Sequence, residues 1–287
     1  IEANLEKYVG IVSHVSLFSD MGREEHELAA RSLQVVSFRM GDMIYDEGTE
    51  GREAWVLEQG QVIASVLCPG IAGSGWEWKE TRPYKPGKFG FFGERGVRRG
   101  EPRQMRMTCM VDTRALKITQ EAYIACARLR EYKENLLRNV QLFEQMTNEQ
   151  IGKLAAIMDK KHFSKGDLIV QAGDPATTFY VLEKGEASTS HPPAVFTSPR
   201  NYQQGESFGE KALYGECTSE SSITAVDDAA ECYTITRDQF EEQLGSLKDL
   251  QLKQLENDPR SLLAQFYQVG DSRGPAGTLQ MQKEKPD

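Results

Sequence analysis

An internal repeat constrains the fold of this chain more than any other feature. A set of apolar and glycine anchors occurs twice in the same order, and the first copy differs by a loop nine residues longer around Pro69–Pro83. A shared order of this length indicates two tandem copies of one domain. The paired anchors are Val15–Phe18 with Val140–Phe143, Phe38–Ile44 with Phe163–Ile169, Gly48 with Gly173, Trp55–Gly60 with Tyr180–Gly185, Phe92–Glu94 with Phe208–Glu210, and Ile118–Thr119 with Ile235–Thr236.

Each copy has helical patterns at both ends and strand signals between them. Apolar residues at helical spacing predict helices over 22–34 and 147–159, and further helices over 119–138 and 236–256. The segments between them are rich in Val, Ile, Phe and Tyr and are separated by glycine turns, which predicts short antiparallel strands. The predicted fold class is α+β, with two tandem domains, each a mainly antiparallel, jelly-roll-like β-barrel of about eight strands flanked by helices.

The repeat also gives the expected domain limits. We expect the first domain over residues 1–138 and the second over residues 139–269. Residues 270–287 carry Gly, Pro, Ser, Gln and Lys with few large apolar groups, so we expect a disordered tail there.

Composition and missing motifs exclude several classes of protein. With 34 basic and 43 acidic residues the net charge is −9, which argues against a nucleic-acid or anionic membrane surface. No apolar stretch approaches the roughly 18 residues of a membrane span. The five cysteines are scattered without zinc spacing, so we expect no metal site and reduced thiols in a cytoplasmic protein. Motifs of P-loop nucleoside triphosphatases, kinases, zinc proteases and serine hydrolases are absent, so we expect neither an enzyme nor a cofactor.

One short segment of the first copy carries the chemistry. Phe92, Gly93 and Glu94 are followed, eight residues after the glutamate, by Pro102 and Arg103. A helix starting after Gly93 would offer free backbone N–H groups, and Arg103 could make a fork-shaped, charge-assisted contact with a phosphate. This arrangement resembles the phosphate-binding cassette of cyclic-nucleotide-binding domains, which occur in tandem in the regulatory subunits of cyclic-AMP-dependent protein kinase and in cyclic-GMP-dependent kinases.

The resemblance implies roles for the residues of the first cassette. Arg103 would hold the cyclic phosphate, and Glu94 would accept the ribose 2′-hydroxyl. Gln104 and Met105 are bulkier than the small residues that usually follow the arginine, and Arg95 and Gly96 replace small and apolar residues of the family. We interpret Arg95 and its neighbours Arg98 and Arg99 as a solvated cluster. The predicted ligand-binding residues of the first domain are Phe92, Gly93, Glu94, Arg95, Gly96, Arg103, Gln104 and Met105.

The second cassette opens in the same way but lacks the arginine. Depending on the offset used, that position falls at Ser219 or at Glu220, and neither side chain can neutralise a phosphate. Lys211 is the remaining cation of the motif. This site is expected to be empty, to bind weakly, or to take an uncharged ligand such as a nucleoside. Its degenerate set of residues is Gly209, Glu210, Lys211, Ala212, Ser219 and Glu220.

The expected function is that of a non-catalytic ligand sensor. The first domain would bind a cyclic nucleotide, cyclic AMP rather than cyclic GMP, because Gln104 stands where cyclic-GMP-dependent kinases carry Thr. A conformational change would then pass to the second domain or to a partner, such as a kinase catalytic subunit. Two alternatives remain open: a scaffold that kept the fold and lost its ligand, and a sensor of an uncharged nucleoside.

Overall fold

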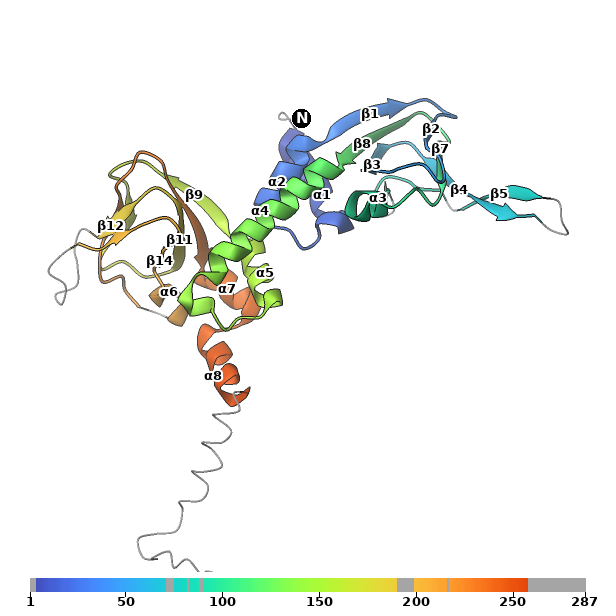
Figure 1. Cartoon of the computed structure of the whole chain (residues 1–287). Helices are drawn as coiled ribbons and strands as arrows, with labels where there is room; N and C mark the ends of the chain where they lie inside the picture. Colours follow the sequence, from blue (N-terminus) through green and yellow to red (C-terminus); the bar gives the residue numbers. More distant parts are fainter. Residues whose placement is uncertain are drawn as a thin grey trace, which may run out of the picture.

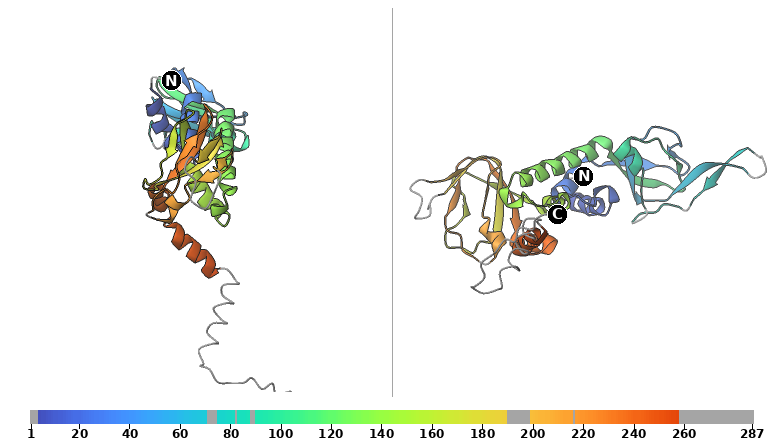
Figure 2. Two further views of the ribbon diagram at one scale, coloured as in Figure 1. Left: turned by 90° about the vertical axis from the view of Figure 1, so that its left-hand side faces the viewer. Right: turned by 60° about the horizontal axis from the view of Figure 1, so that its bottom comes forward.

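The chain forms two β-rich units joined by one long helix. The computed structural model describes residues 4–70, 75–81, 83–87, 90–189, 199–215 and 217–257. Helix α4 (Gln120–Arg138) runs between the units, which lie at opposite ends of the molecule (Figure 1), and the second view of Figure 2 shows the same separation. The expected tail 270–287 lies outside the described residues.

The first unit contains two four-stranded antiparallel sheets. Their strand orders are β1-β8-β3-β6 and β2-β7-β4-β5. Three helices and a 3-10 turn precede or interrupt the strands: α1 (Leu5–Ser13), the turn Ser16–Phe18, α2 (Arg23–Ser32) and α3 (Glu94–Arg99). The strands are β1 (Gln34–Phe38), β2 (Met43–Tyr45), β3 (Glu53–Gln59), β4 (Val62–Pro69), β5 (Trp76–Glu80), β6 (Phe91–Phe92), β7 (Arg106–Cys109) and β8 (Thr113–Thr119).

The second unit repeats this topology strand for strand. Its sheets have the orders β9-β16-β11-β14 and β10-β15-β12-β13. The predicted α+β fold with a duplicated antiparallel barrel is therefore confirmed, whereas the domain limits at 138 and 269 stay predictions. The elements are the 3-10 turn Gln141–Phe143, α5 (Asn148–Ile157), β9 (Asp159–Phe163), β10 (Leu168–Val170), β11 (Thr178–Lys184), β12 (Ala187–Thr189), β13 (Asn201–Tyr202), β14 (Ser207–Phe208), α6 (Lys211–Tyr214), β15 (Ile223–Ala225), β16 (Ala230–Thr236), α7 (Arg237–Leu244) and α8 (Leu247–Asn257).

Equivalent anchors have equivalent places in the two cores. Trp55 lies opposite Phe92 in the β3–β6 pair, and Tyr180 lies opposite Phe208 in the β11–β14 pair. All four side chains are buried. The repeated sequence therefore specifies repeated strand registers, and these registers bring each Phe-Gly-Glu segment to the same edge of its barrel.

The helices differ from the prediction in two places. Helix α1 was not anticipated, and its residues Tyr8, Val9 and Val12 are buried against the first core. The helix predicted over 236–256 is wrong as a single element, because it is interrupted between α7 and α8. Gly245 has φ of +80° there, a left-handed backbone conformation that favours glycine and ends α7. Helix α4 has no such break.

A buried ion pair connects helix α2 with α4. Lys133 and Glu25 are both fully buried, with 2.7 Å between Nζ and Oε1. Next to them, the Tyr233 hydroxyl on β16 donates to Glu24 on α2 over 3.0 Å, and Lys160 on β9 lies 3.2 Å from Glu24. This charged cluster joins the first unit, the long helix and the second unit.

Candidate functional site

A cavity of about 270 Å³ lies at the predicted cassette of the first unit. All eight predicted residues, Phe92 to Gly96 and Arg103 to Met105, line it. Tyr45 on β2 and Tyr84 line it as well, and neither was predicted. Tyr45 belongs to a segment far from the cassette in sequence, whereas Tyr84 lies only eight residues before Phe92. Tyr45 pairs with Met107 on β7, and Tyr84 pairs with Val62 on β4. A comparison of the two copies could have identified Tyr45, because the second copy has Val170 at that position and so lacks an aromatic ring there.

Arg103 is the central residue of this cavity. Its side chain is only 4% exposed, and Nη2 donates to the carbonyl of Glu53 at 2.7 Å and to its carboxylate at 3.2 Å. Nη1 donates to the carbonyl of Gly93 at 3.3 Å. The Nε–H group is buried and has no hydrogen-bond partner among the described residues. A buried donor without a partner is unfavourable by about 1–3 kcal/mol, which an anionic acceptor would relieve.

Tyr45 packs on the face of this guanidinium. The ring centroid lies 4.2 Å from Cζ of Arg103, a cation–π contact that fixes the plane of the arginine. Burial raises the pKa of Tyr45 to about 12, although the nearby Arg103 charge acts in the opposite direction. The phenol is therefore neutral at physiological pH, so Tyr45 does not neutralise the positive charge of Arg103.

Three glycines make room for the arginine and the cassette helix. A Cβ on Gly51 would lie 2.2 Å from Nε of Arg103, and a Cβ on Gly93 would lie 2.8 Å from its Nη1. Gly93 also has φ of +88°, where other residues are strained. A Cβ on Gly96 would lie 2.2 Å from the carbonyl of Gly51. The approach of Arg103 to the backbone is possible only because these positions carry no side chain.

The other polar residues of the cassette have partners of their own. Glu94 receives a hydrogen bond from the Ser16 hydroxyl at 3.2 Å and lies 3.1 Å from Nε of Arg98. Arg95 donates to the amide oxygen of Gln104 over 2.7 Å. Arg95, Arg98 and Arg99 are all exposed, as expected of a solvated cluster. Within it, Arg95 lines the cavity and Arg98 pairs with Glu94.

The second unit has a larger cavity, about 440 Å³, at the equivalent place. Of the predicted residues, Gly209, Glu210, Lys211, Ser219 and Glu220 line it, and Ala212 does not. Lys211 forms an ion pair with Glu220, so each charge compensates the other. Arg200 also lines this cavity, with Cζ 4.7 Å above the ring of Tyr202. No motif in the sequence predicted this residue.

Backbone hydrogen bonds decide which residue replaces the arginine. Arg103 accepts from the N–H of Gly48 and donates to the carbonyl of Thr49. Ser219 makes the same two bonds, accepting from Gly173 at 2.8 Å and donating to Asp174 at 2.8 Å. Since Gly48 and Gly173 are paired anchors, Ser219 and not Glu220 occupies the arginine position.

A neighbouring arginine supports the second cassette from another direction. Arg237, the first residue of α7, donates from Nε to the carbonyl of Ala212 and from Nη2 to that of Ala176, each over 2.6 Å. Ala176 stands at the position of Gly51. The guanidinium of Arg237 therefore binds backbone carbonyls of the second cassette. The methyl group of Ala176 occupies a position at which the first copy has no side chain.

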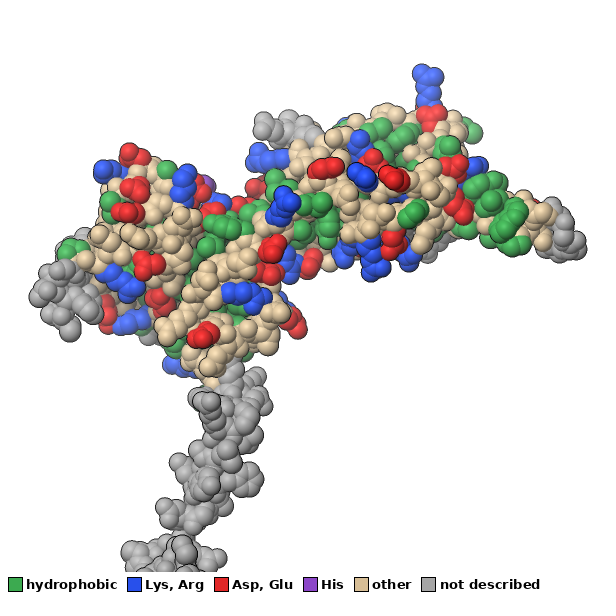
Figure 3. Space-filling model, in the orientation of Figure 1, with side chains coloured by type: hydrophobic (Ala, Val, Ile, Leu, Met, Phe, Trp, Pro, Cys, Tyr) green, Lys and Arg blue, Asp and Glu red, His purple; other side chains and the backbone are tan. Residues whose placement is uncertain are grey.

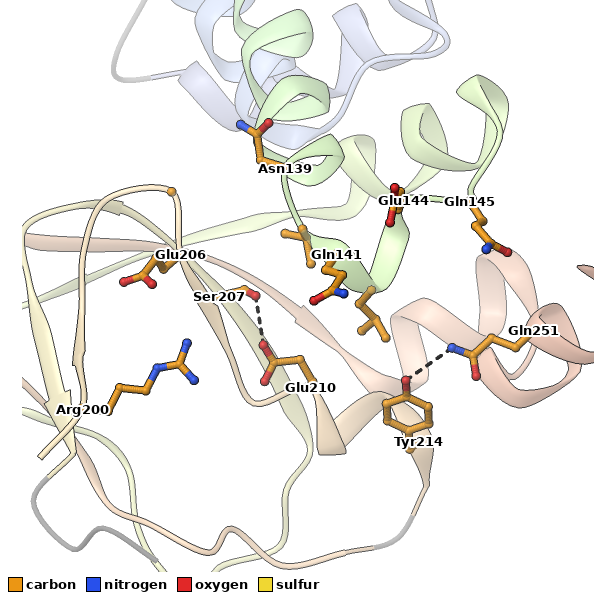
Figure 4. Close-up of a pocket in the computed structure, with 13 residues that line it drawn as sticks. Asn139, Gln141, Glu144, Gln145, Arg200, Glu206, Ser207, Glu210, Tyr214 and Gln251 are labelled. Carbon is orange, nitrogen blue, oxygen red and sulfur yellow. Dashed lines mark hydrogen bonds between the residues drawn. The ribbon is translucent and has the colours of Figure 1, made fainter. Parts of the chain in front are cut away.

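A third cavity, about 890 Å³, lies beside the second cassette (Figure 4). It is lined by the segment after α4, the turn between β13 and β14, and α6 and α8, where Gln251 donates to the Tyr214 hydroxyl at 3.3 Å. Glu210 and Arg200 line both this cavity and the one above. Its walls carry mostly amides and carboxylates and lack the buried guanidinium that distinguishes the first cassette. Within the described residues, no group of His, Cys, Asp and Glu side chains could hold a metal ion.

Comparison with known proteins gives a family for this geometry. Residues 160–246 match the family described as cyclic nucleotide-binding domain. The chain carries a cyclic nucleotide-binding domain. The matched segment is the second copy, which lacks the arginine, so the match identifies the domain and leaves its ligand open. The described helices include none long and apolar enough to cross a membrane.

Relatives of the chain are nucleotide-regulated kinases and their regulatory subunits. It is 25% identical to cGMP-dependent protein kinase 2 of Rattus norvegicus over 224 residues, 75% of this chain and 28% of the kinase. It is 26% identical to the cAMP-dependent protein kinase regulatory subunit of Emericella nidulans over 257 residues, 87% of this chain and 62% of that subunit. The chain thus spans about a quarter of the length of the kinases that it matches.

Solved structures of regulatory subunits also match. The regulatory domain of Toxoplasma gondii PKA with cAMP is 22% identical, with 89% of this chain and 98% of that chain covered and a TM-score of 0.40. A regulatory subunit of a cAMP-independent protein kinase A from Trypanosoma cruzi, bound to guanosine, is 18% identical, with 96% and 97% covered and a TM-score of 0.37.

Proposed function

We propose that the first unit is the ligand-binding domain of a non-catalytic regulatory protein and that its ligand is a cyclic nucleotide. The observation that carries this proposal is Arg103, a buried guanidinium that lines a cavity and keeps an unpartnered Nε–H. A cyclic phosphate would supply the missing acceptor and replace the carboxylate of Glu53. Glu94 would receive the ribose hydroxyl at the mouth of the same cavity.

The base would be read by Gln104, and we propose cyclic AMP as the preferred ligand. Arg95 already donates to the Gln104 amide oxygen, so the amide NH₂ group remains to face the base as a donor. At ring position N1, adenine accepts from such a donor, whereas guanine carries an N–H group there. A competition titration tests this preference, and cyclic GMP winning by tenfold or more would contradict it.

Helix α4 would carry the response from the first unit. It begins directly after β8, where the Thr119 hydroxyl accepts from the N–H of Ala122, and its residue Lys133 joins the charged cluster with Glu24 and Glu25. A shift of α4 would disturb this cluster and thereby the contact with β16. By analogy with the regulatory-subunit relatives, a kinase catalytic subunit is the proposed partner. Amide hydrogen exchange in α2 and β16 should change when nucleotide is added.

The experiment that tests ligand binding is a thermal shift of the purified chain with four compounds, namely cyclic AMP, cyclic GMP, adenosine and inosine. Binding to the native state must raise the melting temperature. Cyclic AMP should raise it in the wild type and fail to do so in Arg103→Ala. A scaffold that kept the fold without its ligand would show no shift with any compound, and that result would contradict the proposal.

A second function is favoured by the charge balance of the second cavity. Lys211 and Glu220 neutralise each other, and Ser219 offers a hydroxyl where a phosphate would need a cation. Val170, Tyr202 and Ile223 add apolar walls. We infer that this cavity suits an uncharged nucleoside better than a cyclic nucleotide. Adenosine or inosine should then raise the melting temperature of Arg103→Ala as much as that of the wild type.

A further inference from the structure

The β4–β5 hairpin of the first unit extends beyond the rest of its barrel. Strand β5 is the outer strand of its sheet, and all five of its residues are exposed. Figure 1 shows the hairpin projecting from the end of the molecule, and Figure 3 shows hydrophobic side chains gathered on it. The counterpart of β5 in the second unit is the two-residue strand β13. Among the described residues of the second sheet, only two residues pair at this place, so the fold does not need an outer strand of five residues there.

Two tryptophans lie on one face of this outer strand. Trp76 is 69% exposed and Trp78 is 40% exposed, and the alternation of a strand places both on the same side. The ring of Trp78 lies 3.9 Å from Cζ of Arg106, which orients the indole. Exposed apolar side chains that adjoin one another on a surface commonly mark a protein contact.

The free edge of β5 offers its backbone at the same residues. Gly70 donates to Gly75 at 2.6 Å, and Thr81 donates to Ala64 at 2.8 Å, so the odd-numbered residues direct their backbone groups towards β4. In an antiparallel ladder the alternate residues direct theirs to the other side. The N–H and C=O groups of Trp76, Trp78 and Glu80 therefore face outward, where a further strand can pair with them.

The sequence of β5 is complementary to itself. We propose that β5 pairs with β5 of a second copy of this chain, antiparallel and centred on Trp78. In that register Trp78 lies opposite its own copy, and Trp76 lies opposite Glu80 and diagonal to Trp78, so the indoles of both copies form one apolar row. On the other face Glu77 lies opposite Lys79 twice, by symmetry. Opposite charges in directly facing positions stabilise a strand pair, and like charges destabilise it.

The expected association is weak and depends on concentration. One pair of five-residue strands contributes less than the roughly 1,200–2,000 Å² of a stable interface. Two tryptophans per copy, at about 150–250 Å² of surface each, supply most of the apolar contact. An interface below that size is typical of a weak monomer–dimer equilibrium, whose populations depend on the protein concentration.

Sedimentation velocity of the full chain at increasing concentration tests the proposal. The wild type should shift from monomer to dimer, whereas Lys79→Glu and Glu77→Lys should each remain monomeric, because like charges then face each other twice. An equimolar mixture of these two variants should dimerise again, since two carboxylates of one chain then face two ammonium groups of the other. A monomeric wild type, or a mixture that fails to associate, would overturn the proposal.

A second pair of variants tests the apolar face. Trp78→Ser should weaken dimerisation at least tenfold, and Leu168→Ser, which alters a half-exposed residue of the second unit, should leave it unchanged. Circular dichroism before each run establishes that both variants are folded. If Leu168→Ser reduces association as much as Trp78→Ser, the contact lies elsewhere and the proposed β5 interface is wrong.

Discussion

The two cassettes share strands, registers and opening glycines, but they use arginine in different ways. In the first, Arg103 lies inside the cavity and has one donor without a partner. In the second, Ser219 takes the same backbone hydrogen bonds, and Arg237 enters from α7 to bind two backbone carbonyls. The first guanidinium is thus available to a ligand, whereas the second stabilises the protein itself.

This difference shows that the fold can be kept without the arginine of the first cassette. The second core retains Phe179, Val181 and Phe208 as buried residues, none of which depends on a nucleotide. The family match falls on this second copy. The core residues that the two units share are therefore distinct from the cassette residues in which they differ.

The largest expected effect is the loss of binding in Arg103→Ala. Truncating one member of a buried charge pair costs about 2–5 kcal/mol, so affinity for cyclic AMP should fall at least about thirtyfold. Isothermal titration calorimetry measures it, with thermal unfolding as the control for the lost bonds to Gly93 and Glu53. Arg103→Lys keeps the charge and should recover only part of the affinity, because the fork geometry is lost. Equal affinities of Arg103→Ala and wild type would contradict the site.

A smaller effect, a gain of cyclic AMP binding, is expected when an arginine is introduced into the second cassette. In the Arg103→Ala background, Ser219→Arg should create measurable cyclic AMP binding, worth about 1.5–3 kcal/mol for a hydrogen bond to a charged group. Glu220→Arg should create less, because the backbone bonds place Ser219 at the arginine position.

The methyl group of Ala176 refines this gain of binding. Its counterpart Gly51 has no room for a Cβ beside Arg103, so Ala176→Gly combined with Ser219→Arg should bind more tightly than Ser219→Arg alone. Ala176→Gly alone serves as the matched control and should not bind. If the single and double variants bind equally, the path of the arginine in the second cassette differs from that in the first.

The sequence predicted the duplicated barrel and the first cassette because those features are local or periodic. Gly93, Glu94 and Arg103 lie within ten residues, and their spacing carries the motif. Gly51 and Tyr45 were missed, because they approach the cavity only through the strand registers that pair distant segments. The additional loop was visible as a difference in length, but its strand β5 was not predicted.

The break between α7 and α8 shows a different limit. Gly245 was present in the sequence, yet the apolar spacing on either side continued well enough to predict one helix. A single glycine costs a helix only about 1 kcal/mol, so tertiary packing decides whether the chain continues or turns. Phe240 and Leu247, on either side of the break, are both buried in the second core. The turn between the two helices, and not a continuous straight helix, places both side chains there.

The smallest effect concerns the link between the first cassette and the turn Ser16–Phe18. The Ser16 hydroxyl donates to Glu94 over 3.2 Å, while Arg98 donates to the Ser16 carbonyl and also pairs with Glu94. In the second cassette Glu210 accepts instead from Ser207, on the adjoining strand. A ribose hydroxyl that approaches Oε2 of Glu94, the oxygen that accepts from Ser16, competes with Ser16 for that oxygen.

Ser16→Ala removes this competitor. A hydrogen bond is worth about 0.5–1.5 kcal/mol, so affinity for cyclic AMP should rise about two- to tenfold by calorimetry. Ser19→Ala is the matched control, because the Ser19 hydroxyl donates to the Ser16 carbonyl and does not contact the cassette. If Ser16→Ala weakens binding instead, the serine positions Glu94 for the ribose, and the turn supports the occupied site. If affinity rises as expected, ligand binding breaks the hydrogen bond between Ser16 and Glu94 and so releases the turn from the cassette. The first unit could then transmit ligand binding through this turn, whereas the described residues of the second unit lack the equivalent hydrogen bond.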